Sequence, residues 1–278
     1  MNPILLAMFW LCGYLALIFT PLLVLLIGPV PDGAGFWWDF SMALGLSGMT
    51  IMGIQFILTA RFRRACAPFG IDIIYYFHRY LAVIGVTLIF AHVLVIWKTN
   101  PAVLGVLNPL EAPWYMTMGR IAFMLFAVII ATSLWRKQLR IEYDHWRIWH
   151  ALLATAAVLL AVLHIEGVGY YINAPIKRVL WTTFTLFWVL LIVYVRLIKP
   201  ARMQLKPYRV LEVRSERGRN NTLVLKPDGH QGLQFSPGQF VWLTLGESPF
   251  HVKEHPFSIA SSAEPVSYTH LTLPTITE

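Results

Sequence analysis

From Ile73 to Trp97 the chain reads IIYYFHRYLAVIGVTLIFAHVLVIW, and this run indicates a membrane protein. It is longer than the roughly 20 apolar residues that cross a bilayer as one helix. Two histidines, His78 and His92, interrupt it fourteen residues apart. Because ionisable side chains are costly inside a membrane span, these two are functional candidates.

A later run, residues 148–165, reads IWHALLATAAVLLAVLHI and holds His150 and His164, again fourteen residues apart. In a helix that spacing is about 21 Å along the axis. It also equals two heptads, so both histidines of a run face nearly the same way in a left-handed bundle. If the two helices are parallel, His78 meets His150 at one depth and His92 meets His164 at another.

Composition supports a membrane protein with a smaller water-exposed part. The 278 residues are 57% apolar and 13% charged, whereas soluble domains average roughly 45–50% and 25%. These values argue against a disordered chain, a nucleic-acid-binding domain and a purely soluble enzyme. The net charge of +8 does not call for a nucleic-acid partner, because Lys and Arg gather in the cytoplasmic loops of membrane proteins. The expected partner is the lipid bilayer.

Six apolar segments are expected to be membrane spans. They are Ile4–Ile27, Phe40–Ala60, Ile73–Trp97, Trp114–Trp135, Ile148–Ile165 and Val179–Val195. Eleven basic residues lie in the loops on one side of these spans, against three on the other, which puts both termini in the cytoplasm. The eleven are Arg61, Arg63, Arg64, Arg136, Lys137, Arg140, Arg147, Arg196, Lys199, Arg202 and Lys206. With this topology the third and fifth spans are parallel, as the histidine pairing requires.

Facing histidine pairs indicate haem. Two opposed imidazoles hold a six-coordinate b-type haem, so two pairs predict two haems, with His78 and His150 near the cytoplasmic side and His92 and His164 near the outer side. A single membrane histidine is more often a hydrogen-bonding residue at a helix contact. A zinc or copper site is the chief competitor, but the ligands of one ion must converge on it, and residues about 21 Å apart cannot.

Three arginines are candidates for binding the anionic haem propionates. Arg79 adjoins the inner pair and Arg147 lies one turn before His150, although cytoplasmic topology explains both charges equally well. Arg120 lies within a span on the side that is poor in basic residues. We therefore expect Arg120 to bind an outer-haem propionate or to line the acceptor pocket.

The composition changes after Lys199-Pro200, where short runs rich in β-branched and aromatic residues alternate with turn material. Three strands are expected, at Tyr208–Arg214, Thr222–Lys226 and Phe240–Leu245. The predicted fold is therefore mainly α: a six-helix transmembrane bundle followed by the first part of an antiparallel β-barrel or sandwich.

Two motifs in this part carry a resemblance to a known family. Pro237-Gly-Gln-Phe240, followed by His255-Pro-Phe-Ser258, resembles the FAD-binding barrel of the ferredoxin–NADP reductase superfamily, in the version found in ferric reductases and NADPH oxidases. Those families also have six helices with histidine pairs on the third and fifth. The segment Tyr143–Arg147 running into His150-Ala-Leu-Leu153 resembles their bacterial members.

The resemblance implies roles for individual residues. The four histidines, His78, His92, His150 and His164, match the haem ligands of these families. Phe257 would lie against the isoalloxazine ring of FAD, and Ser258 would approach flavin N5. His255, followed by Pro256, would help to hold the FAD pyrophosphate.

The implied function is that of a membrane flavocytochrome b in the bacterial inner membrane. Electrons from cytoplasmic NAD(P)H would pass through FAD and two b-type haems to an external acceptor, which is oxygen, a ferric chelate or another periplasmic oxidant. A quinone-linked respiratory cytochrome b is a second hypothesis, but such a subunit has no need of His255–Ser258. A proton-coupled transporter is a third hypothesis, and it predicts a colourless protein.

The expected domains are 1–199, the haem-binding helical domain, 200–264, a partial FAD barrel, and 265–278, a non-native tail. No nucleotide-binding G-x-G-x-x-G motif follows a strand. The chain is therefore expected to be a fragment that is inactive with NAD(P)H. The tail resembles one reading frame of a transposon-based sequencing adapter and is left out of fold reasoning; a genuine stop codon after Glu278 in genomic DNA would contradict this origin.

Overall fold

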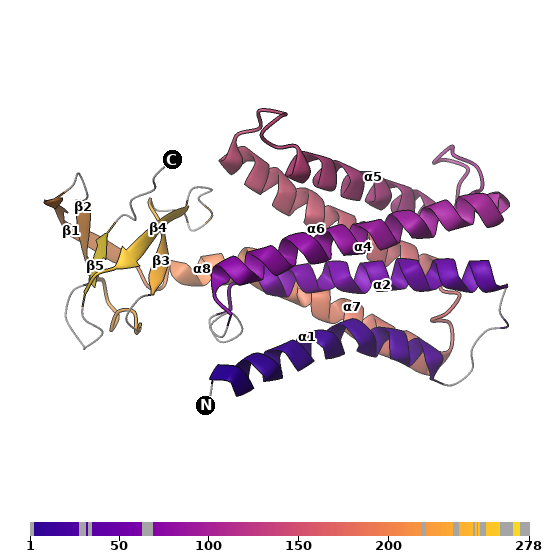
Figure 1. Ribbon diagram of the computed structural model, residues 1–278, viewed down its shortest axis with the longest axis horizontal. Coiled ribbons are helices and arrows are strands. Elements are labelled where there is room, and N and C mark those ends of the chain that lie inside the picture. The colour runs from indigo at the N-terminus through magenta and orange to yellow at the C-terminus, as the bar shows by residue number, and fades with distance from the viewer. Residues whose placement is uncertain are drawn as a thin grey trace. The chain divides into compact units, whose positions relative to one another are not determined.

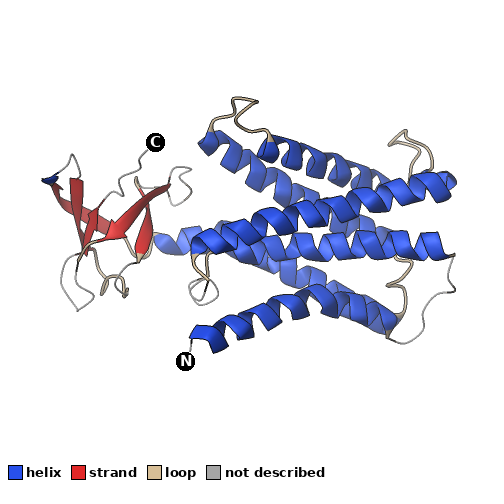
Figure 2. Ribbon diagram, in the orientation of Figure 1, coloured by secondary structure: helices blue, strands red, loops and turns tan. Residues whose placement is uncertain are grey.

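The computed structural model divides into two compact units, 1–192 and 193–278. It describes residues 3–27, 32, 35–62, 69–217, 221–235, 239–246, 248, 250, 254–261 and 269–272. Figures 1 and 2 trace the helices of the first unit and the strands of the second. Several residues named above lie outside the described ones: Arg63, Arg64, Pro237, Gly238 and the end of the expected barrel segment, 262–264.

Six helices in the described part are long and apolar enough to cross a membrane, so the chain is a multi-pass membrane protein. They are α1 (Pro3–Leu26), α2 (Phe36–Thr59), α4 (Ile71–Thr99), α5 (Trp114–Leu134), α6 (Tyr143–Val168) and α7 (Pro175–Val193). A short 3-10 helix, η1 (Pro101–Leu104), follows α4. The expected number of spans is confirmed.

Helix α6 differs most from its predicted bounds, while α2 and α7 each begin four residues before the predicted start. Helix α6 has 26 residues and begins five residues before the predicted Ile148. The reason is an N-terminal cap, since the Glu142 carboxylate accepts the backbone N–H of His145 at 3.1 Å. The backbone N–H groups of His145 and Asp144 also hold the pKa of Glu142 below its usual range. Polar residues thus occupy the first turns of α6, and hydropathy alone set its start too late.

Helix α2 is the central helix of the first unit. Of its most apolar window, 56% is buried, against 11–17% in the other five spans. It packs along α4, while α5 packs along α6 (Figure 1). Glycines allow the first contact, because a Cβ on Gly48 would lie 2.8 Å from the carbonyl oxygen of Gly85. Small residues at such crossings bring two helix backbones close together.

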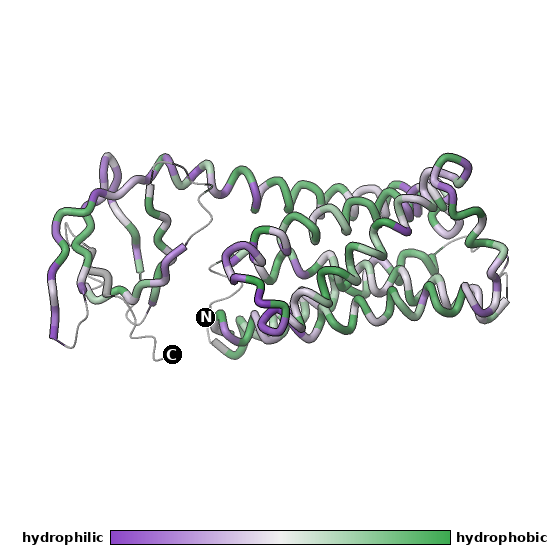
Figure 3. Tube along the Cα trace, turned by 90° about the horizontal axis from the view of Figure 1, so that it is seen from above, coloured by the Kyte–Doolittle hydropathy of each residue, from purple (hydrophilic) through white to green (hydrophobic). Residues whose placement is uncertain are grey.

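The largest hydrophobic cluster joins α2, α4, α5, α6 and α7. Its fully buried members include Phe126 of α5 and Ala157 of α6, at 1% and 0% exposure. Ala157 is midway in sequence between His150 and His164, so this core lies between the two histidine depths. Outward-facing positions are also apolar, for example Phe9 at 66% exposure, as expected for side chains in contact with lipid. Figure 3 shows hydrophobic residues along the helices.

The second unit begins with a π-helical turn, η2 (Tyr194–Ile198), and a short helix, α8 (Lys199–Met203). Five strands follow: β1 (Tyr208–Ser215), β2 (Asn221–Pro227), β3 (Phe240–Thr244), β4 (Glu254–Ile259) and β5 (Thr269–Thr272). They form one antiparallel sheet in the order β1-β2-β5-β4-β3. The three predicted strands are confirmed to within about one residue, and the helical-then-antiparallel fold class with them.

A closed barrel is not formed by the described residues, in which β1 and β3 are the two edges of the sheet. Strand β4 contains the His255–Ser258 motif. Strand β5 lies within the segment expected to be non-native and pairs with both β2 and β4. The FAD-type barrel and the adapter origin of the tail stay predictions.

Candidate functional site

His78 of α4 and His150 of α6 face each other, as predicted. Their ring centroids are 6.2 Å apart, with planes inclined by 74°. A metal–imidazole bond of about 2 Å, plus roughly 1 Å from the nitrogen to the ring centre, separates two opposed imidazole ligands by about 6 Å. The spacing of this pair, called here the first level, therefore suits two axial ligands of one metal.

The surroundings of Nδ1 differ between the two histidines of the first level. His150 Nδ1 lies 3.3 Å from the hydroxyl oxygen of Ser133, whose own proton is donated to the Ile129 carbonyl at 2.6 Å. Ser133 therefore accepts from an Nδ1–H of His150, at a distance longer than an ordinary hydrogen bond. His78 Nδ1 is buried and has no hydrogen-bond partner in the part of the chain that the structure describes.

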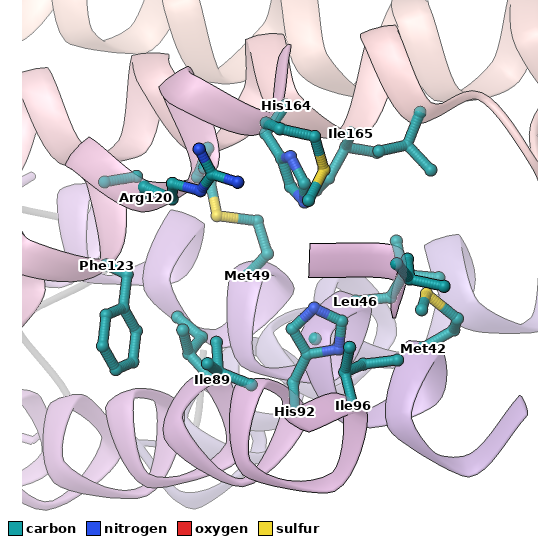
Figure 4. A pocket seen from close by; sticks show the side chains of 18 of the residues that line it. Met42, Leu46, Met49, Ile89, His92, Ile96, Arg120, Phe123, His164 and Ile165 are labelled. Atoms are coloured by element: carbon teal, nitrogen blue, oxygen red, sulfur yellow. The ribbon is translucent and has the colours of Figure 1, made fainter. Parts of the chain in front are cut away.

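His92 of α4 and His164 of α6 line a cavity of about 560 Å³ and form the second level. Figure 4 shows the two rings entering this space from opposite walls. The rest of the lining is largely apolar and comes from α2, α4, η1, α5, α6 and the loop after α6. His92 and His164 therefore meet across a shared cavity, which is large and apolar enough for a flat hydrophobic cofactor.

Backbone carbonyls fix the tautomer of both rings at the second level. His92 Nδ1 lies 2.8 Å from the Ser41 carbonyl oxygen, and His164 Nδ1 lies 2.9 Å from the Tyr115 carbonyl oxygen. A carbonyl can only accept, so Nδ1 carries the proton in each ring. The Nε2 lone pair is then left for a metal, which is the usual arrangement of a ligating histidine.

Glycines lie against the same two rings. A Cβ on Gly119 of α5 would stand 2.6 Å from His164 Nδ1. A Cβ on Gly45 of α2 would stand 3.1 Å from the Cγ and Nδ1 atoms of His92. Because glycine has no side chain, each imidazole can pack directly against the backbone of a neighbouring helix.

The three predicted arginines have different surroundings. Arg120 lines the cavity, and its Nη2 donates to the Leu104 carbonyl oxygen. Its Nη1 is buried and has no partner among the described residues, so it is a donor available to an anion in the cavity. Arg79 is exposed on α4, and Arg147 is half-buried on α6.

The predicted FAD residues lie on one strand but on different faces. Phe257 is 4% exposed and packs with Leu225 in the core of the sheet. Ser258 is exposed, and His255 and Pro256 are half-buried. Since Phe257 has no free ring face in this arrangement, its stacking on flavin is not supported by the geometry, whereas the positions of His255 and Ser258 are compatible with a ligand.

Sequence reasoning missed the residues that support the histidines from other helices. Ser41, Gly45, Tyr115 and Gly119 come from α2 and α5, which carry none of the four histidines. No spacing within one helix reveals such contacts, because each is made between helices. A serine and two glycines within apolar runs were the available signals.

Residues 44–161 match the family described as the ferric reductase like transmembrane component. The matched range runs from within α2 to within α6 and includes His78, His92 and His150. None of the curated proteins compared with the chain matches it. The family match implies, in general terms, an oxidoreductase-type membrane domain for electron transfer across the bilayer.

Proposed function

We propose that this protein carries single electrons across the bacterial inner membrane, with both termini in the cytoplasm. The whole path runs from cytoplasmic NAD(P)H through FAD and two b-type haems to an external acceptor, which is oxygen, a ferric chelate or another oxidant. The observation that carries the proposal is the presence of two opposed histidine pairs at two depths of one helical unit.

The residues of both levels fit haem. At the first level His78 and His150, with ring centroids 6.2 Å apart, would hold the iron of one haem between them. At the second level His92 and His164 keep Nε2 free and share an apolar cavity. Bound haem supplies one-electron chemistry, and axial ligands and burial tune its potential. The chain's contribution is to hold two haem sites at successive depths of the helical unit and to exclude water from them.

Cationic and polar groups support the remaining parts of the path. The unpartnered Nη1 of Arg120 suits a haem propionate or an anionic acceptor in the cavity. Arg79 and Arg147 are proposed to bind propionates at the first level, because each is close in sequence to one of its ligands.

The flavin part of the proposal rests on the motif His255-Pro256-Phe257-Ser258. A nicotinamide donor would supply electrons in pairs, as a hydride, whereas a haem held by the histidine pairs would accept them singly. The path therefore needs a group that accepts a pair and passes on single electrons, which is the chemistry that FAD supplies. His255 and Ser258 are the residues of this chain that we propose to contact it.

A reduced-minus-oxidised spectrum of the purified chain from haem-supplied cells tests the proposal. We expect two b-type haems in the parent protein. His92→Ala should lose the second-level haem and keep the first, and His150→Ala should do the reverse. His145→Ala is the matched control, because this histidine is exposed at the start of α6 and pairs with Glu142 at 2.8 Å.

Three results would contradict the proposal. A colourless, well-folded parent would favour a transporter in which the histidines relay protons. A parent whose haems both survive His92→Ala and His150→Ala would place the ligands elsewhere. A two-haem protein that is reduced by quinol rather than by a flavin-linked donor would favour the quinone-linked alternative.

A further inference from the structure

The two histidine levels differ in how the chain holds Nδ1. At the second level both Nδ1–H groups donate to backbone carbonyls, at 2.8 Å for His92 and 2.9 Å for His164. At the first level His150 has a 3.3 Å contact to a hydroxyl, and His78 Nδ1 has no hydrogen-bond partner among the described residues. Both supporting carbonyls come from helices that carry no ligand, so this asymmetry is a property of helix packing.

Ser41 offers His92 two acceptors. Its carbonyl oxygen lies 2.8 Å from His92 Nδ1 and its Oγ lies 3.0 Å from the same atom. The Ser41 hydroxyl proton is donated to the His92 carbonyl at 3.0 Å, so Oγ presents a lone pair to the Nδ1–H. Ser41 is 0% exposed, and exclusion of water strengthens hydrogen bonds of this kind.

Gly119 supports His164 by leaving space for its ring. The hydrogen bond from His164 Nδ1 to Tyr115 requires the ring to lie against the backbone of α5. A Cβ at position 119 would stand 2.6 Å from Nδ1, 2.8 Å from Cγ and 3.0 Å from Cε1 of that ring. Any side chain at this position therefore displaces the imidazole from its acceptor.

We infer that Ser41 and Gly119 are positioning residues that act through His92 and His164, and that they make these two imidazoles more electron-donating than His78, whose Nδ1 has no hydrogen-bond partner among the described residues. A histidine whose N–H donates to a strong acceptor is a more basic metal ligand. More basic axial ligands favour the oxidised metal and lower its reduction potential. The inference rests on the proposed function, because it concerns the ligands of the proposed haems.

A redox titration of the full purified chain, followed by its visible spectrum, tests the role of Ser41. Each haem should give one wave, that is, one reduction step in the titration. The His92→Ala protein should keep only the first-level haem, so its single wave identifies the first level. Ser41→Ala removes the Oγ acceptor at 3.0 Å and keeps the backbone carbonyl, so it should raise the midpoint potential of the second wave through the loss of Oγ alone and leave the first unmoved. Ser133→Ala is the matched control, since it removes the hydroxyl that contacts His150; it should leave the second wave unmoved.

Gly119→Ala gives a second readout. We expect about tenfold weaker haem retention at the second level, in the range found when outer-shell partners of metal ligands are changed, with an altered low-spin ferric EPR signal and an unchanged first level. Gly13→Ala is the control, because no atom lies within 4 Å of a Cβ there.

The outcomes separate this inference from the proposed function. A parent that binds two haems, but whose second wave is unmoved by Ser41→Ala, overturns the inference alone. Equal movement of both waves also overturns it, because that is the result expected of general destabilisation. A parent that binds no haem overturns the proposed function, and the inference with it.

Discussion

At the scale of the residue, Arg120 is the charged group most directly associated with the second level. One of its terminal nitrogens is engaged by the Leu104 carbonyl of η1, while the other is buried without a partner among the described residues. Burial of an unsatisfied charged donor costs free energy. Its place in the wall of the cavity is therefore explained best by an anionic ligand.

Substitution of Arg120 should shift the midpoint potential of the proposed second-level haem in the direction opposite to the shift expected for Ser41→Ala. A nearby positive charge favours the reduced state of a metal site, so Arg120→Gln should lower the second midpoint potential. The expected size is on the order of a tenfold change in the reduction equilibrium, about 59 mV for one electron. The measurement is the same redox titration.

Lys98→Gln is the matched control for Arg120→Gln. It removes an exposed charge near the end of α4 that lies over the Trp97 ring. An exposed charge is screened by water and salt, so this change should leave both waves in place. Equal shifts in the two variants would contradict a specific role for Arg120.

At the scale of the element, α1 is tied to the bundle by a buried lysine of α7. Lys177 is 1% exposed, and its Nζ donates to the Leu25 carbonyl oxygen at 2.6 Å, near the end of α1. The last carbonyls of a helix have no partner within the helix, and a cation there also interacts favourably with the helix dipole. Trp181 and Ile172 pack with Leu25 around this contact.

Lys177→Ala should loosen α1 while leaving both haems in place. The change leaves the Leu25 carbonyl without its donor, which costs about 1–3 kcal/mol. We expect faster amide exchange in the last turn of α1 and an unchanged haem spectrum, because α1 carries no ligand. Arg178→Ala, at the exposed neighbouring position, should change neither. Loss of haem in Lys177→Ala would show that α1 supports the histidine sites.

At the scale of the whole molecule, the proposed haem ligands and the proposed flavin motif belong to different units. All four histidines lie within 1–192, as do Ser41, Tyr115 and Ser133, which contact them, whereas His255–Ser258 lies within 193–278. The hydrophobic clusters follow the same division: one cluster joins five helices, and another lies within the sheet around Phe257. Each unit has its own core, as expected of separate domains.

A chain that ends after Met203 should keep both haem signals and their midpoint potentials. The four histidines and the carbonyl groups of Ser41 and Tyr115 that accept from His92 and His164 all lie in the part that is kept. Flavin binding, measured by quenching of FAD fluorescence, should be confined to the full chain. Loss of one haem on truncation would contradict this division of labour. Equal FAD binding by both chains would place the flavin site outside the sheet.

The sequence alone determined the spans and the pairing of the histidines. Hydropathy locates spans because bilayer thickness sets helix length, and equal fourteen-residue spacing in two parallel helices forces His78 toward His150 and His92 toward His164. The start of α6 was missed because a polar cap, rather than hydropathy, sets it.

Only the tertiary structure decided which groups contact the histidine rings and the other candidate side chains. The carbonyl of Ser41, the space at Gly119, the unpartnered nitrogen of Arg120 and the burial of Phe257 all depend on which side chains meet between elements far apart in the chain. The physical reason is that periodicity reports the face of a helix, whereas hydrogen bonds and excluded volume depend on the neighbour that the fold places against that face.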